Sequence, residues 1–177
     1  MYNKGVRRFC VDMAHGDSIA CVDTIKYIKS LFNNSAKKSY SEKKLQDNHI
    51  IAGNVATVSG FIRLQKAGAN GIRAGIASGA ICSTAIETGF GVPILTNIID
   101  MAKYKNKNTW LIADGGCKAT GDIAKAVYFG ADFVMMGKML ASTDLACGSC
   151  YNKNKEKLNQ NIKIESDEDY FACVYPH

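Results

Sequence analysis

Short apolar segments alternate with amphipathic segments along the chain. Apolar stretches at residues 6–12, 49–54, 70–76, 109–113 and 132–136 have the length of buried strands. A segment that can form a helix follows each of the first four. Repeated strand–helix units of this kind predict a parallel sheet covered by helices on both faces, which is an α/β fold.

The first helical segment shows the clearest spacing. Apolar residues recur every third position from Ile19 to Leu31, with Asp17 or Ser18 as the N-cap. The residues predicted to face the core are Ile19, Val22, Ile25, Ile28 and Leu31. Thr57 is in cap position for the second helix.

Further helices and two long loops complete the prediction. The remaining helices are expected over 57–66, 95–104 and 121–129, and the loops over 33–48 and 77–93. The stretch 33–48 is rich in Lys and Ser, and 77–93 is rich in small residues, which favours loops.

Composition adds the domain organisation. A chain of 177 residues, 47% hydrophobic and 21% charged, is typical of one globular domain. Residues 1–146 carry the strand–helix units, and residues 147–177 form a polar tail expected to be loop-like. No apolar run reaches the roughly 18 residues of a membrane span, and the start lacks a signal-peptide core. We therefore expect a cytoplasmic protein without a membrane partner.

The charge balance says little about partners. The net charge is +6, and much of the excess lies in residues 37–44 and 153–163. Such charge could attract nucleic acid or phosphorylated metabolites. Because the chain shows no basic groove pattern interleaved with stacking aromatics, nucleic acid is not expected, and two solvated loops are the favoured interpretation.

The seven cysteines indicate reduced thiols, most of them small buried side chains. Cys147 and Cys150 have the spacing of a metal or redox pair. A structural zinc site needs a second pair, so we interpret this one as part of a loop.

Polar residues and glycines stand where each predicted strand ends. They are Asp12, Gly53-Asn54, Gly75-Ile76, Asp114-Gly115-Gly116 and Gly137. In parallel α/β folds the carboxyl ends of the strands form the site. One shared site at this edge of the sheet is therefore predicted.

Two of the segments suggest chemistry by themselves. The carboxylate of Asp114 can accept hydrogen bonds from ribose hydroxyls, and Gly115 and Gly116 can offer N–H groups to a phosphate. A tight turn is the alternative. Cys82 lies in a loop of small residues, where a thiolate could meet a substrate. An inert thiol is the alternative there.

Five segments in order resemble the GMP reductase and IMP dehydrogenase family of (β/α)8 barrels. The resemblance covers roughly residues 8–150. The segments are Asp12-Met13-Ala14-His15-Gly16, Ile51-Ala52-Gly53-Asn54-Val55-Ala56-Thr57, Gly75-Ile76-Ala77-Ser78-Gly79-Ala80-Ile81-Cys82-Ser83-Thr84, Asp114-Gly115-Gly116-Cys117 with Gly121-Asp122-Ile123-Ala124-Lys125-Ala126, and Gly130-Ala131-Asp132-Phe133-Val134-Met135-Met136-Gly137. Thr88-Gly89 is similar to the reductase branch.

The resemblance implies a reaction and its residues. NADPH-dependent reductive deamination of GMP to IMP and ammonia is expected, with Cys82 attacking C2 of the purine and Thr84 handling protons. The residues expected to hold the nucleotide are Asp114, Gly115, Gly116, Gly137 and Lys138. Those expected to contact NADPH are Asp12, Met13, Ala14, Ile76 and Ala77. A potassium ion is expected on the backbone carbonyls of Ala77, Gly79, Cys82 and Ala85.

The resemblance also leaves alternatives open. Oxidation of IMP with NAD on the same fold is the second hypothesis, and an inactive nucleotide-binding fragment is the third. Family members are nearly twice as long and are usually tetramers. This chain corresponds to about five βα units of the barrel, a partial barrel. The first three units and the mobile flap are expected to lie outside it.

Overall fold

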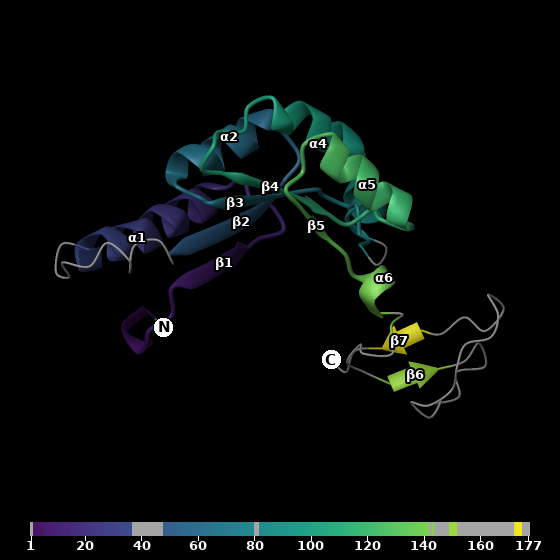
Figure 1. Ribbon diagram of the computed structural model, residues 1–177, viewed down its shortest axis with the longest axis horizontal. Coiled ribbons are helices and arrows are strands. Elements are labelled where there is room, and N and C mark those ends of the chain that lie inside the picture. Colours follow the sequence, from purple (N-terminus) through teal and green to yellow (C-terminus); the bar gives the residue numbers. More distant parts are fainter. Residues whose placement is uncertain are drawn as a thin grey trace.

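The computed structural model describes residues 2–36, 48–79, 82–141, 143, 149–151 and 172–174. Five parallel strands form one sheet, as the alternating pattern predicted (Figure 1). The strands are β1 (Arg8–Asp12), β2 (His49–Val55), β3 (Gly71–Ala74), β4 (Trp110–Asp114) and β5 (Phe133–Met135). The helices are η1 (Tyr2–Lys4), α1 (Ile19–Ala36), α2 (Val58–Ala67), α3 (Thr84–Thr88), α4 (Ile94–Ala102), α5 (Thr120–Tyr128) and α6 (Lys138–Ala141).

The strands lie in chain order, β1-β2-β3-β4-β5, and every neighbouring pair is parallel. The register sets Asp12 beside Gly53 and Gly53 beside Arg73. Within the described residues, β1 and β5 each pair with one neighbour only. The sheet therefore has two edges open to further pairing.

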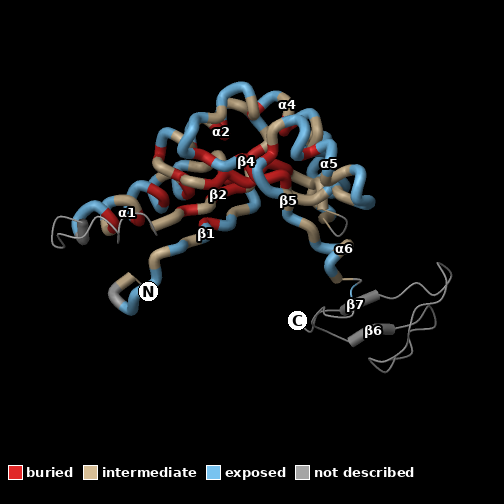
Figure 2. Tube along the Cα trace, in the orientation of Figure 1, coloured by how far each residue is buried: buried red, intermediate tan, exposed pale blue. Residues whose placement is uncertain are grey.

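Helices α1, α2, α4 and α5 cover one face of the sheet (Figure 1). The buried residues concentrate between this helical layer and strands β2 to β4 (Figure 2). Its fully buried side chains include Phe61 and Leu64 from α2, Ile72 from β3 and Leu111 from β4. The prediction of helices on both faces was wrong for the described residues, since the other face carries none.

The uncovered face bears apolar side chains. His49 stacks on Trp110 with ring centroids 5.2 Å apart, and Trp110 meets Phe133 edge to face at 5.7 Å. The side chain of Phe133 is 53% exposed, and Met135 beside it is also exposed. In a closed barrel such residues fill the interior.

The helix caps follow the sequence closely. The Ser18 hydroxyl accepts a hydrogen bond from the N–H of Cys21 at 3.2 Å, and the Thr57 hydroxyl accepts one from Gly60 at 3.1 Å. Both expected caps are confirmed. The face of α1 differs from the prediction, because Ile19 is exposed and Val22 and Leu31 are only half-buried.

The true core face of α1 uses spacings of three and four. Its buried members are Cys21, Ile25, Ile28 and Phe32. A helix repeats every 3.6 residues, so a strict spacing of three drifts off the buried face within two turns. Residues 33–36, predicted as loop, continue α1, and 37–47 lie outside the described residues.

Two further features departed from expectation. The predicted loop 77–93 contains the five-residue helix α3, and the predicted tail contains an antiparallel strand pair, β6 (Ser149–Tyr151) and β7 (Ala172–Val174). The division at residue 146 stays a prediction.

The cysteine prediction was partly wrong. Of the four cysteines whose side chains are described, all of them free, Cys21 is buried, Cys82 and Cys117 are half-buried, and Cys10 is exposed. The side chains of Cys147 and Cys150 lie outside what the structure describes.

Candidate functional site

The carboxyl ends of β1 to β4 bring four polar side chains into one connected group. They are Asp12 from β1, Asn54 from β2, Arg73 from β3 and Asp114 from β4. Because parallel strands end at the same edge, residues far apart in sequence meet there. At the edge where a shared site was predicted, these four side chains therefore contact one another.

Asn54 uses its whole side chain within this group. Its Nδ2 donates to the carbonyl oxygen of Gly75 and to Oδ2 of Asp114, each at 2.7 Å. Its Oδ1 accepts from Nε of Arg73 at 2.8 Å. The amide thereby fixes Oδ2 of Asp114, whereas Oδ1 accepts no hydrogen bond from the described residues.

Arg73 is buried, with 8% of the residue exposed. Its Nη2 donates to the carboxylate of Asp12, and its Nε lies 3.5 Å from Oδ2 of Asp114. A buried guanidinium requires paired charge, which the two carboxylates supply.

Cys82 and Thr84 form a second group on the loop after β3. Cys82 Sγ lies 3.2 Å from Oγ1 of Thr84, the first residue of α3. The Thr84 hydroxyl and the backbone N–H of Thr84 lower the pKa of the Cys82 thiol, although desolvation and, to a smaller extent, the charge of Asp114 oppose them. Hydrogen bonds to the thiolate favour the charged, nucleophilic form.

The cysteine loop packs directly on the Asp-Gly-Gly turn. The Ser78 hydroxyl donates to the backbone carbonyl oxygen of Asp114. Gly115 has a φ of +81°, and a Cβ there would lie 2.8 Å from the backbone nitrogen of Gly79. A glycine is needed at this contact, which sets the cysteine loop against the predicted ribose residue.

The glycines predicted to hold phosphate differ in what they can donate. The N–H of Gly115 already donates to the Met135 carbonyl at 3.1 Å. The N–H of Gly116 has no hydrogen-bond partner in the described part of the chain. Gly137 and Lys138 lie where α6 begins, and the Gly137 carbonyl accepts from Ala141 at 2.9 Å. Of Gly115 and Gly116, Gly116 is therefore the better placed to donate its N–H to an anion.

The residues predicted to contact NADPH lie at the same edge. Met13 exchanges backbone hydrogen bonds with Gly53 and Asn54, at 2.8 and 3.0 Å, which ties the end of β1 to β2. The carboxylate of Asp12 is 69% exposed, so it is open to a ligand.

The other predicted NADPH residues fit that placement. Ala14 is exposed, and Ile76 and Ala77 are half-buried after β3. Ala77 has a φ of +64°, a left-handed conformation in which alanine is strained.

The carbonyl set predicted for potassium is partly in use. The Gly79 carbonyl accepts from the N–H of Cys82 at 3.1 Å, and that of Ala85 accepts from Gly89 at 3.0 Å. Within the described residues, no three His, Cys, Asp or Glu side chains gather to hold a metal. Each of these two carbonyls keeps a second lone pair, and the potassium site stays a prediction.

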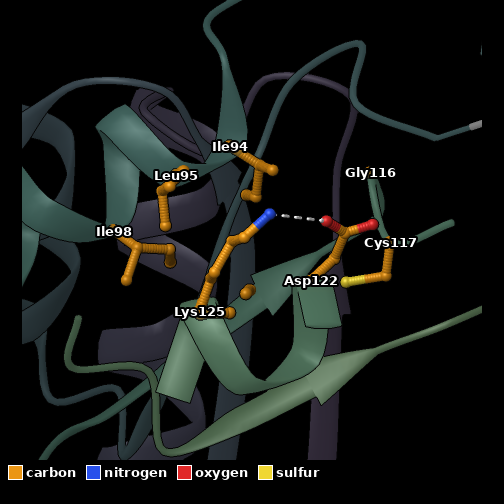
Figure 3. Close-up of a pocket in the computed structure, with 9 residues that line it drawn as sticks. Ile94, Leu95, Ile98, Gly116, Cys117, Asp122 and Lys125 are labelled. Atoms are coloured by element: carbon orange, nitrogen blue, oxygen red, sulfur yellow. Dashed lines mark ion pairs between the residues drawn. The ribbon is translucent and has the colours of Figure 1, made fainter. Parts of the chain in front are cut away.

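A small pocket lies between α4 and α5 on the helical side, with Gly116 and Cys117 in its lining (Figure 3). Its volume is about 60 Å³, room for a few waters rather than a nucleotide. Lys125 points toward Asp122, with Nζ 3.6 Å from the carboxylate.

None of the described helices has the length and apolar character needed to cross a membrane.

Arg73 was missed in the sequence, and Asn54 was noted only as a strand-end residue. The signal for Arg73 was its position inside the short strand Gly71–Ala74, where a charged residue is rarely buried without a partner. Its partners come from other strands, so no local pattern named them. Ala80 of the cysteine loop lies outside the described residues.

Known proteins match both the sequence and the fold. The IMP dehydrogenase / GMP reductase domain family matches residues 1–166. The chain is 39% identical over 158 residues to inosine-5'-monophosphate dehydrogenase of Nitrosopumilus maritimus, and 40% identical over 159 residues to GMP reductase of Leishmania major. Each alignment covers 89% of this chain and 30% of the relative.

The fold agrees with a solved GMP reductase. A cysteine-to-alanine variant of the Trypanosoma brucei enzyme, in complex with guanosine 5'-monophosphate, matches 88% of this chain at 35% identity with a TM-score of 0.72. The match covers 30% of that structure's chain. The chain thus spans about a third of these relatives, which are longer than the expected twofold, and forms part of a (β/α)8 barrel. It belongs to the IMP dehydrogenase / GMP reductase family.

Proposed function

We propose that this chain carries the nucleophile and the nucleotide-binding edge of a GMP reductase site. The observation that carries the proposal is the pairing of Cys82 with Thr84 on a loop packed against the Asp114-Gly115-Gly116 turn. A thiol with a lowered pKa and a carboxylate with a free oxygen then share one edge.

Each residue has a defined task in this reaction. The thiolate of Cys82 forms a bond to C2 of the purine, the bond from C2 to the exocyclic amino nitrogen breaks, and that nitrogen leaves as ammonia. The Thr84 hydroxyl, 3.2 Å from the sulfur, is placed to pass protons during that loss. Asp114 grips the ribose and Gly116 the phosphate.

NADPH, when bound, supplies the hydride that replaces sulfur at C2, so that the electron pair returns to Cys82 and IMP is released. Asp12, Met13, Ala14, Ile76 and Ala77 are the residues we expect beside it. The open carboxylate of Asp12 suits a ribose or amide donor of the cofactor.

Oxidation of IMP with NAD is the second candidate, because relatives of both names match at similar identity. The Thr88-Gly89 pair, where Gly89 ends α3 in the left-handed conformation, favours the reductase. In a cytoplasmic, tetrameric whole protein, the remaining barrel and flap would complete the site.

Two segment exchanges test the choice. In one hybrid, this chain replaces the aligned segment of the Leishmania reductase. In a second hybrid, it replaces the aligned segment of the Nitrosopumilus dehydrogenase. We expect the first hybrid to consume NADPH with GMP, the second to be inactive with IMP and NAD, and Cys82→Ser to silence the first. Activity in the dehydrogenase host alone would favour the second candidate. Activity in neither host would contradict both.

A further inference from the structure

Arg73 occupies a position that the reaction as described does not use. Its guanidinium contacts a carboxylate on each side, Asp12 from β1 and Asp114 from β4, and an amide between them, Asn54 from β2. Under the proposed function, Asp12 faces the cofactor and Asp114 faces the nucleotide. One buried side chain therefore touches both halves of the site.

The backbone makes room for this contact. The register sets Asp12, Gly53 and Arg73 side by side on three strands. A Cβ on Gly53 would lie 2.8 Å from Cβ of Arg73 and 2.7 Å from its carbonyl oxygen. Because Gly53 has no side chain, the guanidinium can cross β2 and reach Asp12.

The hydrogen bonds leave Asn54 no freedom to rotate. Both its amide protons are donated, and its oxygen accepts from Arg73. A rotation of the amide would set its NH2 group against the guanidinium, donor against donor. Arg73 thereby fixes the orientation of the Asn54 amide, in which Nδ2 donates to Asp114.

We propose that Arg73 is a positioning residue that holds Asp12, Asn54 and Asp114 as one unit, so that the nucleotide-side and cofactor-side carboxylates are oriented together. The terms nucleotide side and cofactor side rest on the proposed function. The grouping of Asp12, Asn54 and Asp114 rests only on their contacts with Arg73. The planar fork matters, since lysine offers a point charge that cannot meet three acceptors in fixed directions.

The first test reads the unit without any ligand. Solvent exchange of the Asn54 side-chain amide protons is measured by NMR in the 177-residue chain, with the signals assigned through Asn54→Asp. We expect Arg73→Lys and Arg73→Met to speed exchange roughly fivefold to tenfold, as for one lost net hydrogen bond. Arg63→Lys is the matched control, because Arg63 pairs with Asp17 at 2.9 Å on the helical side.

Asp12→Asn separates positioning from mere support of the fold. Asp12 is largely exposed, and no hydrogen bond joins its side chain to Asn54 among the described residues. The side-chain contacts from Asp12 to Asn54 run through Arg73. We therefore expect faster Asn54 exchange in this variant, at a smaller amplitude. Should Arg73→Met fail to fold, Arg73→Lys and Asp12→Asn still decide.

The second test adds GMP. Arg73→Lys should raise the dissociation constant roughly tenfold in the wild-type background and leave it unchanged in an Asp114→Ala background. Asn54 exchange that is the same in Arg73→Lys, Asp12→Asn and wild type would overturn the positioning role. GMP that fails to bind the wild-type chain would instead count against the proposed function, and the exchange data would still judge Arg73.

Discussion

The sulfur of Cys82 and the hydroxyl oxygen of Thr84 lie 3.2 Å apart, two residues from each other on the loop that opens α3. The contact does more than fix the loop. It is the largest cause of the lowered pKa of the Cys82 thiol. The residue proposed to move protons also prepares the nucleophile.

Thr84→Val should therefore raise the pKa of Cys82. Hydrogen bonds favour the thiolate, so their loss shifts ionisation to higher pH and slows alkylation by iodoacetamide near neutral pH. The measurement is the pH dependence of Cys82 alkylation, read by peptide mass spectrometry. Thr84→Ser, which keeps the hydroxyl, is the control, and a midpoint that Thr84→Val leaves in place would disprove the assignment.

Gly115→Ala should disturb the cysteine loop. Its Cβ would lie 2.8 Å from Gly79 N and 2.9 Å from the carbonyl carbon of Ser78, at a φ that alanine resists. We expect a loss of about 1–3 kcal/mol in the free energy of unfolding. Gly121→Ala is the control, because nothing lies within 4 Å of that position. Equal denaturation midpoints for the two variants would refute the packing argument.

Asp114→Ala should weaken GMP binding roughly ten- to a hundredfold, as for a lost charge-assisted hydrogen bond. The structure adds a cost in stability of about 1–3 kcal/mol, because Asn54 loses a hydrogen-bond acceptor and Arg73 loses an ion-pair partner. Calorimetric titration and urea unfolding measure the two effects. Asp100→Ala, which removes an exposed pair with Lys103, should change neither. Unaltered GMP affinity in Asp114→Ala would exclude the ribose assignment.

The 177-residue chain alone should bind GMP weakly and consume no NADPH. Its edge strands β1 and β5 lack a second neighbour in the described part, and Trp110 and Phe133 stay exposed on the open face. Water is then not excluded from the thiolate. An NADPH absorbance assay with size-exclusion chromatography tests this, and steady consumption by a monodisperse monomer would contradict it.

Local patterns predicted the parts of the fold that depend on neighbours in sequence. The strands, the Thr57 cap and the placement of Asp114 at a strand end all follow from runs of a few residues. The helix α3 did not, because its five residues bury no side chain and so leave no apolar period to detect.

The centre of the site depends on register instead. Arg73 meets Asp12 only because Gly53 stands between them on the middle of three paired strands. Strand pairing joins residues about sixty positions apart, such as Asn54 and Asp114. A single sequence shows a charged residue in an apolar strand, and it does not show which partners neutralise it.

Protection of Cys82 by GMP is the sharpest test of whether the Cys82 thiol and the Asp114 turn share one nucleotide site. The chain is alkylated with limiting iodoacetamide, with and without GMP or AMP, and each cysteine peptide is quantified. We expect Cys82 to react faster than Cys21 and Cys117, whose thiol pKa values burial raises. GMP, not AMP, should slow Cys82 alone, and Asp114→Ala should abolish the protection. Alkylation of Cys82 at the rate of Cys117, unaffected by millimolar GMP, would contradict the shared site.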